Sequence, residues 1–349
     1  MIAIEFHDRK REIDSIMRIL KSPPNLITFV YGPINSGKSS LMMEVARRLP
    51  ENHVVFYINL RHIYVSGVDD FLRVLFEVKD RKKFSNFKSL VKELLTYTPD
   101  EIVTPIGRFP IPKNVFQEIF RERSVENVFV YLENLLTEIA RKGKTPVLIL
   151  DELQKISDVK INGPLIYELF NFFVGLTKEL HVCHVFAITS DSLFMERVYT
   201  EAMLHGRCRY LLVDDFDHDT ARSFLEKYGF SEEEIELTWE YFGGKPVYLV
   251  EAVKEKDRLK EFCEEMLRIR KRQIKDSIYS LDEDFRRAVL EIFAQFREEE
   301  RITYEYLTEE LIWCMKNNIL FLEPVNELIK PQSRLDLLAL RRLLRELNY

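Results

Sequence analysis

A glycine-rich segment that ends in lysine and serine carries the clearest chemistry in this chain. Residues 32–39 read GPINSGKS, which fits the pattern G-x-x-x-x-G-K-[ST], and they follow the apolar run NLITFVY. Gly32 and Gly37 permit a tight turn, so that successive N–H groups and the positive end of the following helix converge on a phosphate. Lys38 is expected to neutralise β- and γ-phosphate charge, and Ser39 stands where such loops place a hydroxyl on Mg²⁺. The segment therefore predicts a nucleotide site.

The predicted nucleotide contacts comprise the whole loop and the start of the helix behind it. They are Gly32, Pro33, Ile34, Asn35, Ser36, Gly37, Lys38, Ser39 and Ser40. Spacing assigns the metal position to Ser39 rather than to Ser40. The alternative is a simple glycine turn between a strand and a helix, and it is disfavoured because glycine makes up only 11 of the 349 residues.

A second, acidic motif favours hydrolysis of ATP over the chemistry of a GTPase or a small-molecule kinase. In TPVLILDELQ, residues 145–154, a short apolar run of buried-strand type delivers Asp151 and Glu152 to its carboxyl end. Asp151 is predicted to hold the Mg²⁺ shell, and Glu152 to orient and activate water against the γ-phosphate. A GTPase would carry an N-K-x-D motif, which the sequence lacks. The alternative is an acidic loop after a core strand.

Length and composition limit the number of domains and the cellular compartment that we expect for this chain. At 349 residues and 46% apolar composition, the chain is long enough for two or three domains. The sequence has no run of about 18 apolar residues and is charged from Glu5 onward, so we expect neither a membrane span nor a signal peptide, and a cytoplasmic protein. The net charge of −6 gives no overall attraction to nucleic acid.

Strand and helix patterns alternate in the first part of the chain. Strands are predicted at 26–31, 54–60, 147–150, 182–188 and 210–213. Their alternation with helices predicts a parallel sheet covered on both faces, which is a three-layer α/β core at 1–215. An insertion at about 61–145 shows helical patterns near 68–78, 84–97 and 125–141, and the segment EIVTPIGRFPIP reads as a hairpin.

Helical patterns dominate the rest of the chain. Residues 216–278 predict a small helical domain, which ends in the basic run RIRKRQIK at 268–275. In 279–349 the order is helix, helix, helix and hairpin, which is the order of a winged helix.

Four shorter motifs complete a recognisable pattern: FHDRKRE at 6–12, FAITSDS at 186–192, HGR at 205–207 and GGKP at 243–246. With the phosphate loop and the acidic pair, they resemble the archaeal ATPase family of the AAA+/STAND group of P-loop proteins over nearly the whole chain. The resemblance implies a P-loop NTPase core with sheet order 5-1-4-3-2, a helical lid and a winged-helix-like domain. It also implies binding of ATP or ADP with Mg²⁺.

The resemblance also assigns roles to residues outside the two main motifs. Arg9, with Glu12, would close against the adenine side of the nucleotide. Thr189 or Ser190 would act as the sensor beside the γ-phosphate; the alternative is a helix cap formed by Ser190 and Asp191.

Two further assignments concern an arginine finger and the lid. Arg207 is the leading candidate for the finger, in its own subunit or in a neighbouring one, and Arg209 is the reserve. Pro246 would lie near the base and Lys245 near phosphate, whereas a helix that starts at proline would explain the motif without a ligand. The lid shows no clear second-sensor arginine.

These observations leave three functional hypotheses. The first is an ATPase switch, slow without its partner, that acts on an unidentified protein or nucleic acid. The second is an ATP-regulated DNA-binding protein that uses the winged helix and the basic run 268–275. Residues 281–349 hold 14 acidic and 10 basic residues, which argues against its simplest form. The third is a nucleotide-stabilised scaffold. The oligomeric state stays open.

Overall fold

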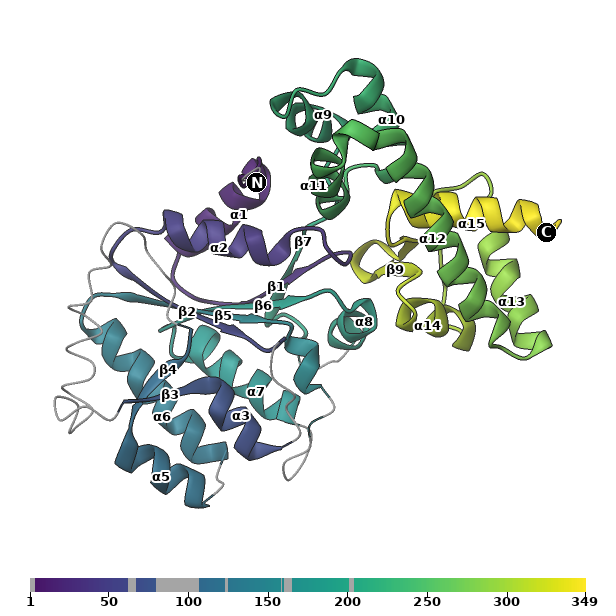
Figure 1. Cartoon of the computed structure of the whole chain (residues 1–349). Coiled ribbons are helices and arrows are strands. Elements are labelled where there is room, and N and C mark those ends of the chain that lie inside the picture. Colours follow the sequence, from purple (N-terminus) through teal and green to yellow (C-terminus); the bar gives the residue numbers. More distant parts are fainter. Residues whose placement is uncertain are drawn as a thin grey trace.

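The computed structural model describes residues 4–61, 67–79, 107–122, 125–157, 159, 165–200 and 204–349. A five-stranded parallel sheet lies at the centre of the N-terminal part (Figure 1). Its strands are β1 (Ile27–Tyr31), β2 (His53–Asn59), β5 (Thr145–Asp151), β6 (His184–Thr189) and β7 (Cys208–Leu212). The spatial order β2-β5-β6-β1-β7 confirms the predicted order 5-1-4-3-2, counting these five strands along the chain.

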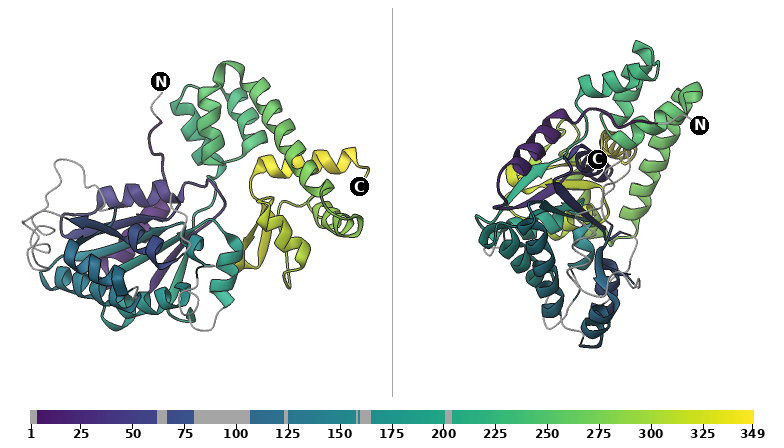
Figure 2. Two further views of the ribbon diagram at one scale, coloured as in Figure 1. Left: turned by 60° about the horizontal axis from the view of Figure 1, so that its bottom comes forward. Right: turned by 90° about the vertical axis from the view of Figure 1, so that its left-hand side faces the viewer.

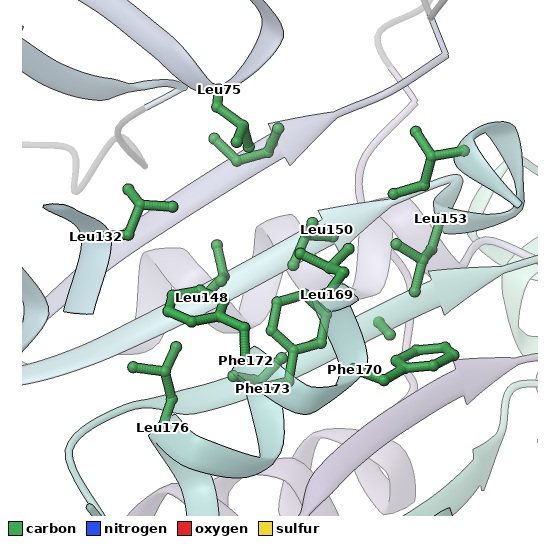
Figure 3. Close-up of a cluster of buried hydrophobic side chains, with 14 of the residues drawn as sticks. Leu75, Leu132, Leu148, Leu150, Leu153, Leu169, Phe170, Phe172, Phe173 and Leu176 are labelled. Carbon is green, nitrogen blue, oxygen red and sulfur yellow. The ribbon is translucent and has the colours of Figure 1, made fainter. Parts of the chain in front are cut away.

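Helices cover both faces of this sheet, as the alternating pattern predicts (Figure 1). One face carries α1 (Lys10–Lys21) and α2 (Lys38–Arg48), and the other carries α6 (Val125–Arg141) and α7 (Leu165–Val174). Successive residues of β1 point to opposite faces, so Phe29 joins the core under α7 while Val30 joins the core under α2. Figure 3 shows leucine and phenylalanine side chains packed on the α6 and α7 face of the sheet. This double burial holds the strand ends rigidly.

The insertion adds a small unit beside β2. It contains α3 (Val68–Leu75), β3 (Phe76–Lys79), β4 (Phe109–Pro112) and α5 (Lys113–Glu122). The predicted helix at 68–78 is too long, because from Phe76 the chain forms a strand that pairs in parallel with β4. The helix predicted at 84–97 and the first half of the predicted hairpin lie outside the described residues.

Helices follow the sheet and form a separate layer above it (Figure 2). They are α9 (His218–Lys227), α10 (Glu232–Phe242), α11 (Pro246–Lys254) and the long α12 (Leu259–Tyr279). Side-chain caps start two of them: Asp217 caps α9, and Ser231 with Glu234 forms a capping box on α10. Within the described ranges, none of the helices combines the length and apolar content that crossing a bilayer requires.

The C-terminal part packs on the same apolar core as these helices. Its elements are α13 (Glu283–Ala294), β8 (Ile302–Thr303), α14 (Glu309–Lys316), β9 (Leu320–Glu323), β10 (Leu328–Pro331) and α15 (Arg334–Glu346). The strands form an antiparallel sheet of order β8-β10-β9. The predicted order of helix, helix, helix and hairpin is wrong, because the hairpin β9-β10 follows the second helix, α14, and the third helix, α15, comes after the hairpin. One cluster of buried side chains runs from Ala221 to Leu344, which joins the helical layer to the C-terminal part.

The basic run on α12 is occupied by contacts within the chain. Arg270 pairs with Asp336, Lys271 and Lys275 pair with Glu346, and Arg272 pairs with Asp276, so four of the five cations in 268–275 have internal carboxylate partners. Most of these pairs join α12 to α15. The run therefore contributes to the packing of α12 against α15, while Arg268 and Arg272 stay exposed.

Candidate nucleotide site

The phosphate loop connects the carboxyl end of β1 to the start of α2. Gly32 has φ 155°, and a Cβ there would lie 2.1 Å from the carbonyl oxygen of Val213, so only glycine fits. Gly37, with φ 90°, forms the N-cap of α2. The first N–H groups of α2 are thereby left at the mouth of the loop, where they can donate to an anion.

Lys38 is buried in the loop and holds it together from inside. Its Nζ donates to the carbonyls of Gly32 at 2.9 Å and Pro33 at 2.7 Å. Burial, with the nearby charge of Lys245, lowers the pKa of Lys38 to about 7. Glu152, Asp151 and Asp215 lie near enough to offset part of this lowering, and a bound phosphate would offset it further by adding negative charge.

The predicted metal residues meet across the sheet edge. Ser39 Oγ donates to Asp151 Oδ2 at 2.7 Å, and the hydroxyl of Tyr57 donates to the same oxygen at 2.6 Å. Asp151 is buried, and its Oδ1 has no hydrogen-bond partner among the described residues. A hydroxyl and a buried carboxylate with a free oxygen are ligands that Mg²⁺ prefers, so these residues fit that ion.

Glu152 follows in a strained backbone conformation. Its φ of 63° and ψ of 45° lie in the left-handed region, which is costly for a residue with a side chain and recurs at functional sites. The carboxylate accepts from Arg61 at 2.5 Å on Oε1 and from Gln154 Nε2 at 2.8 Å on Oε2. Both oxygens therefore have a donor in this structure.

The predicted sensor residues, Thr189 and Ser190, lie close to this carboxylate. Thr189 Oγ1, at the end of β6, donates to Gln154 Oε1 at 2.8 Å and is thus linked to Glu152 through one side chain. Ser190 lines a cavity together with Glu152 and Lys38. The capping role falls to Asp191, whose Oδ1 accepts from the N–H groups of Leu193 and Phe194 at the start of α8 (Ser192–Thr200). Ser190 is therefore not needed as a cap.

Two adjoining cavities surround the loop. The larger, of about 710 Å³, lies on the predicted adenine side and is lined by Phe6, Arg9, Phe216, Pro246 and Val250 among others. The smaller, of about 330 Å³, lies on the phosphate side and is lined by Lys38, Ser39, Arg61, Glu152 and Ser190 among others. The residues that line both cavities are Gly37, Ser39, Ser40, Pro246 and Val250. One elongated ligand could therefore reach both cavities past the start of α2.

Arg9 positions the loop from the N-terminal side. Its guanidinium donates to the carbonyl of Ser36 at 2.6 Å, pairs with Glu12 at 2.8 Å and lies 4.4 Å from the ring centre of Phe216. This predicted site residue is thus placed between the loop and the segment that leads into the lid.

Two side chains from distant parts of the sequence bind the loop at one residue, Ile34. Lys245, at the N-cap of α11, donates to the carbonyl of Ile34 at 3.1 Å and pairs with Asp215 at 2.8 Å. The N–H of Ile34 donates to Gln332 Oε1 at 3.1 Å, and Gln332 is buried beyond the end of β10. Three parts of the chain therefore meet at Ile34.

Arg207 lies away from this site. It is exposed, and its carbonyl accepts from the N–H of Ile27 at 3.1 Å, which places it at the amino end of β1 and β7. The phosphate loop follows the carboxyl end of β1, about 16 Å along the strand. Arg207 could therefore serve only the nucleotide of another molecule. Arg209 binds Asn25 at that same remote edge.

Sequence reasoning missed several residues of the site. They are Tyr57, Arg61, Gln154 and Gln332. Tyr57 and Arg61 could have been predicted from the strand order. Because β2 is parallel to β5, the carboxyl end of β2 must lie beside Asp151. Gln332 is 298 residues from Ile34 and no local pattern indicates it.

Comparison with known families agrees with this geometry. Residues 6–252 match the ATPase domain found predominantly in Archaea. The chain belongs to this archaeal ATPase family. Residues 260–344 match the C-terminal domain of MJ1010-like ATP-binding proteins. Among relatives of this chain, an ATP-binding protein of Pyrococcus abyssi is 50% identical over 97% of this chain and 98% of its own length. One from Methanocaldococcus jannaschii is 48% identical over 99% of each chain.

Solved structures show the same fold at low sequence identity. A Walker-type ATPase of Pyrococcus abyssi aligns with TM-score 0.61 at 18% identity, over 96% of each chain. The ORC2 protein of Aeropyrum pernix, solved as ADPNP and ADP complexes, aligns with TM-score 0.51 at 12% identity, over 99% of this chain and 95% of ORC2. An ATPase-type α/β core is therefore the fold of this family member.

Proposed function

We propose that this chain is a cytoplasmic, magnesium-dependent ATPase that hydrolyses ATP to ADP and inorganic phosphate. The observation that carries the proposal is the Ser39 to Asp151 hydrogen bond, because it joins the phosphate loop to the acidic pair at one point. Glu152 is the next residue and lines the phosphate-side cavity with Lys38. A binding-only site would have no need for a carboxylate at that place.

The roles follow from the groups available. The amides at the start of α2 and Lys38 would hold the phosphates, and Ser39 and Asp151 would hold magnesium. When bound, magnesium would neutralise charge on the β- and γ-phosphates. Glu152 accepts a proton from the attacking water. The water oxygen bonds to the γ-phosphorus, and the bond from that phosphorus to the bridging oxygen breaks, so that ADP leaves.

The test is phosphate release from ATP by the full chain, with magnesium and then with EDTA. We expect release to fall to background in EDTA and to return when magnesium is added in excess. Release that is equal in both conditions would contradict a metal-assisted reaction. The absence of release in magnesium, with and without cell extract, would leave only nucleotide binding.

We further propose that nucleotide drives a switch in domain arrangement. The division into a core at 1–215, a lid at 216–278 and a winged-helix-like domain at 279–349 places Lys245 on the lid and Gln332 on the last domain. Both hold the peptide of Ile34 inside the phosphate loop. Lys330 of the last domain also pairs with Asp214 at the end of the core. If the loop rearranges around a triphosphate, the contacts of Lys245 and Gln332 with Ile34 change, and both outer domains can then move. We propose that an unidentified macromolecule binds one of the two domain arrangements more tightly than the other.

Gln332→Ala tests this coupling. If nucleotide binding breaks the contact with Ile34, the wild-type chain gives up one hydrogen bond each time it binds ATP. The variant lacks this bond in the free state already, so we expect its affinity for ATP to rise about 5-fold. Titration calorimetry measures the affinity, and hydrogen exchange of residues 319–333 with and without nucleotide reports the coupling. Gln295→Ala, on the exposed end of α13, is the control and should change neither. Unchanged affinity and exchange in Gln332→Ala would remove this contact from the switch.

A further inference from the structure

We propose that Arg61 recognises the terminal phosphate of ATP within its own chain and, by moving to it, releases Glu152 for catalysis. This inference rests on the proposed ATPase function. Arg61 lies two residues beyond the end of β2, and its guanidinium pairs with Glu152 Oε1 at 2.5 Å. It lines the phosphate-side cavity together with Lys38 and Ser190. No sequence motif assigned it a role.

The two partners of this ion pair differ in their freedom to move. The Glu152 side chain is 10% exposed and is held by Gln154, whereas the Arg61 side chain is 55% exposed. Arg61 is therefore the partner that can leave. A guanidinium is permanently charged and can donate two parallel hydrogen bonds to a phosphate, so the γ-phosphate is a stronger ligand for it than one carboxylate oxygen.

The ion pair between Arg61 and Glu152 explains how the catalytic base could become active only when ATP is bound. Each oxygen of Glu152 already accepts one hydrogen bond from a protein donor, so the guanidinium of Arg61 competes with the attacking water for Oε1. A γ-phosphate in the cavity draws Arg61 away and frees Oε1. ADP has no γ-phosphate and leaves the pair in place. Arg61 would thus distinguish ATP from ADP and couple that recognition to the base.

The position of the other candidate arginine supports this assignment. Arg207 lies at the amino edge of the sheet and could act only on another molecule, whereas Arg61 is already at the carboxyl edge. Among the described residues that line the phosphate-side cavity, the cations are Lys38 and Arg61. Lys38 belongs to the loop itself, so Arg61 is the cation placed to report the terminal phosphate.

Arg61→Ala separates the possibilities. We would measure the dissociation constants of ADP and of the non-hydrolysable analogue AMPPNP, each with magnesium, together with kcat and KM for ATP. We expect the affinity for AMPPNP to fall about 10- to 100-fold while ADP binding stays within about 2-fold, because only the terminal phosphate loses a partner. We expect kcat to fall about 1,000-fold. Arg61→Lys should recover part of the AMPPNP affinity.

Arg48→Ala is the matched control. Arg48 is 49% exposed, pairs with Glu44 at 2.8 Å and lies at the far end of α2, so its removal should change none of these values. An unchanged ratio of AMPPNP to ADP affinity in Arg61→Ala would overturn the inference. A raised kcat with that ratio unchanged would also overturn it, since Arg61 would then only restrain Glu152. A wild-type chain that binds neither nucleotide would refute the ATPase proposal itself.

Discussion

Replacing Glu152 with glutamine is expected to leave ATP binding intact and to lower phosphate release by about 100-fold or more. Glutamine keeps the shape of the side chain but cannot accept the proton of the attacking water. Its amide also forms a weaker partner for Arg61, so the affinity for ATP should stay equal or rise. Steady-state phosphate release and calorimetric titration with AMPPNP measure the two quantities.

The matched control for this variant is Glu44→Gln. Glu44 also pairs with an arginine, Arg48, but at the far end of α2, and its replacement should not change turnover. If Glu152→Gln released phosphate at the wild-type rate, another group would have to be the base. If it lost ATP binding as well, Glu152 would be needed for the shape of the site rather than for proton transfer.

The second large effect is expected from Lys38→Ala, which should weaken binding of both ATP and ADP by about 100-fold or more. A charge-assisted hydrogen bond contributes about 1.5–3 kcal/mol, and Lys38 can make more than one to the phosphates. The free chain also loses the bonds from Nζ to Gly32 and Pro33. Its melting temperature without nucleotide should therefore be measured beside the dissociation constants.

Lys144→Ala provides the comparison. Lys144 also donates to a backbone carbonyl, that of Glu51 at 2.7 Å, but it precedes β5 at the opposite edge of the sheet. This variant should bind nucleotide normally. Wild-type affinity in Lys38→Ala, with the fold intact, would show that the loop binds nucleotide through its amides alone.

Local signals predicted much of the core of the site. The backbone at residue 32 lies so close to the carbonyl of Val213 that only glycine fits there. A glycine in the sequence can therefore indicate such a close contact. Asp151 and Glu152 follow an apolar run, and the buried strand does deliver them to the sheet edge. The strand order was predicted from the family resemblance and is confirmed. In the insertion, the boundary at Phe76 was missed because a helix and a strand that adjoin without a turn share one apolar run.

The sequence by itself determined that a phosphate loop, a hydroxyl and an acidic pair exist, since each depends on residues close together in the chain. Only the tertiary structure decided which side chains bind them. Arg61 donates to Glu152, which is 91 residues away in the sequence, and Gln332 accepts from Ile34, which is 298 residues away. It also decided that Arg207 lies at the remote edge of the sheet. The physical reason is that a turn or a strand end is encoded by its neighbours, whereas the partner of a long polar side chain depends on which distant elements pack beside it.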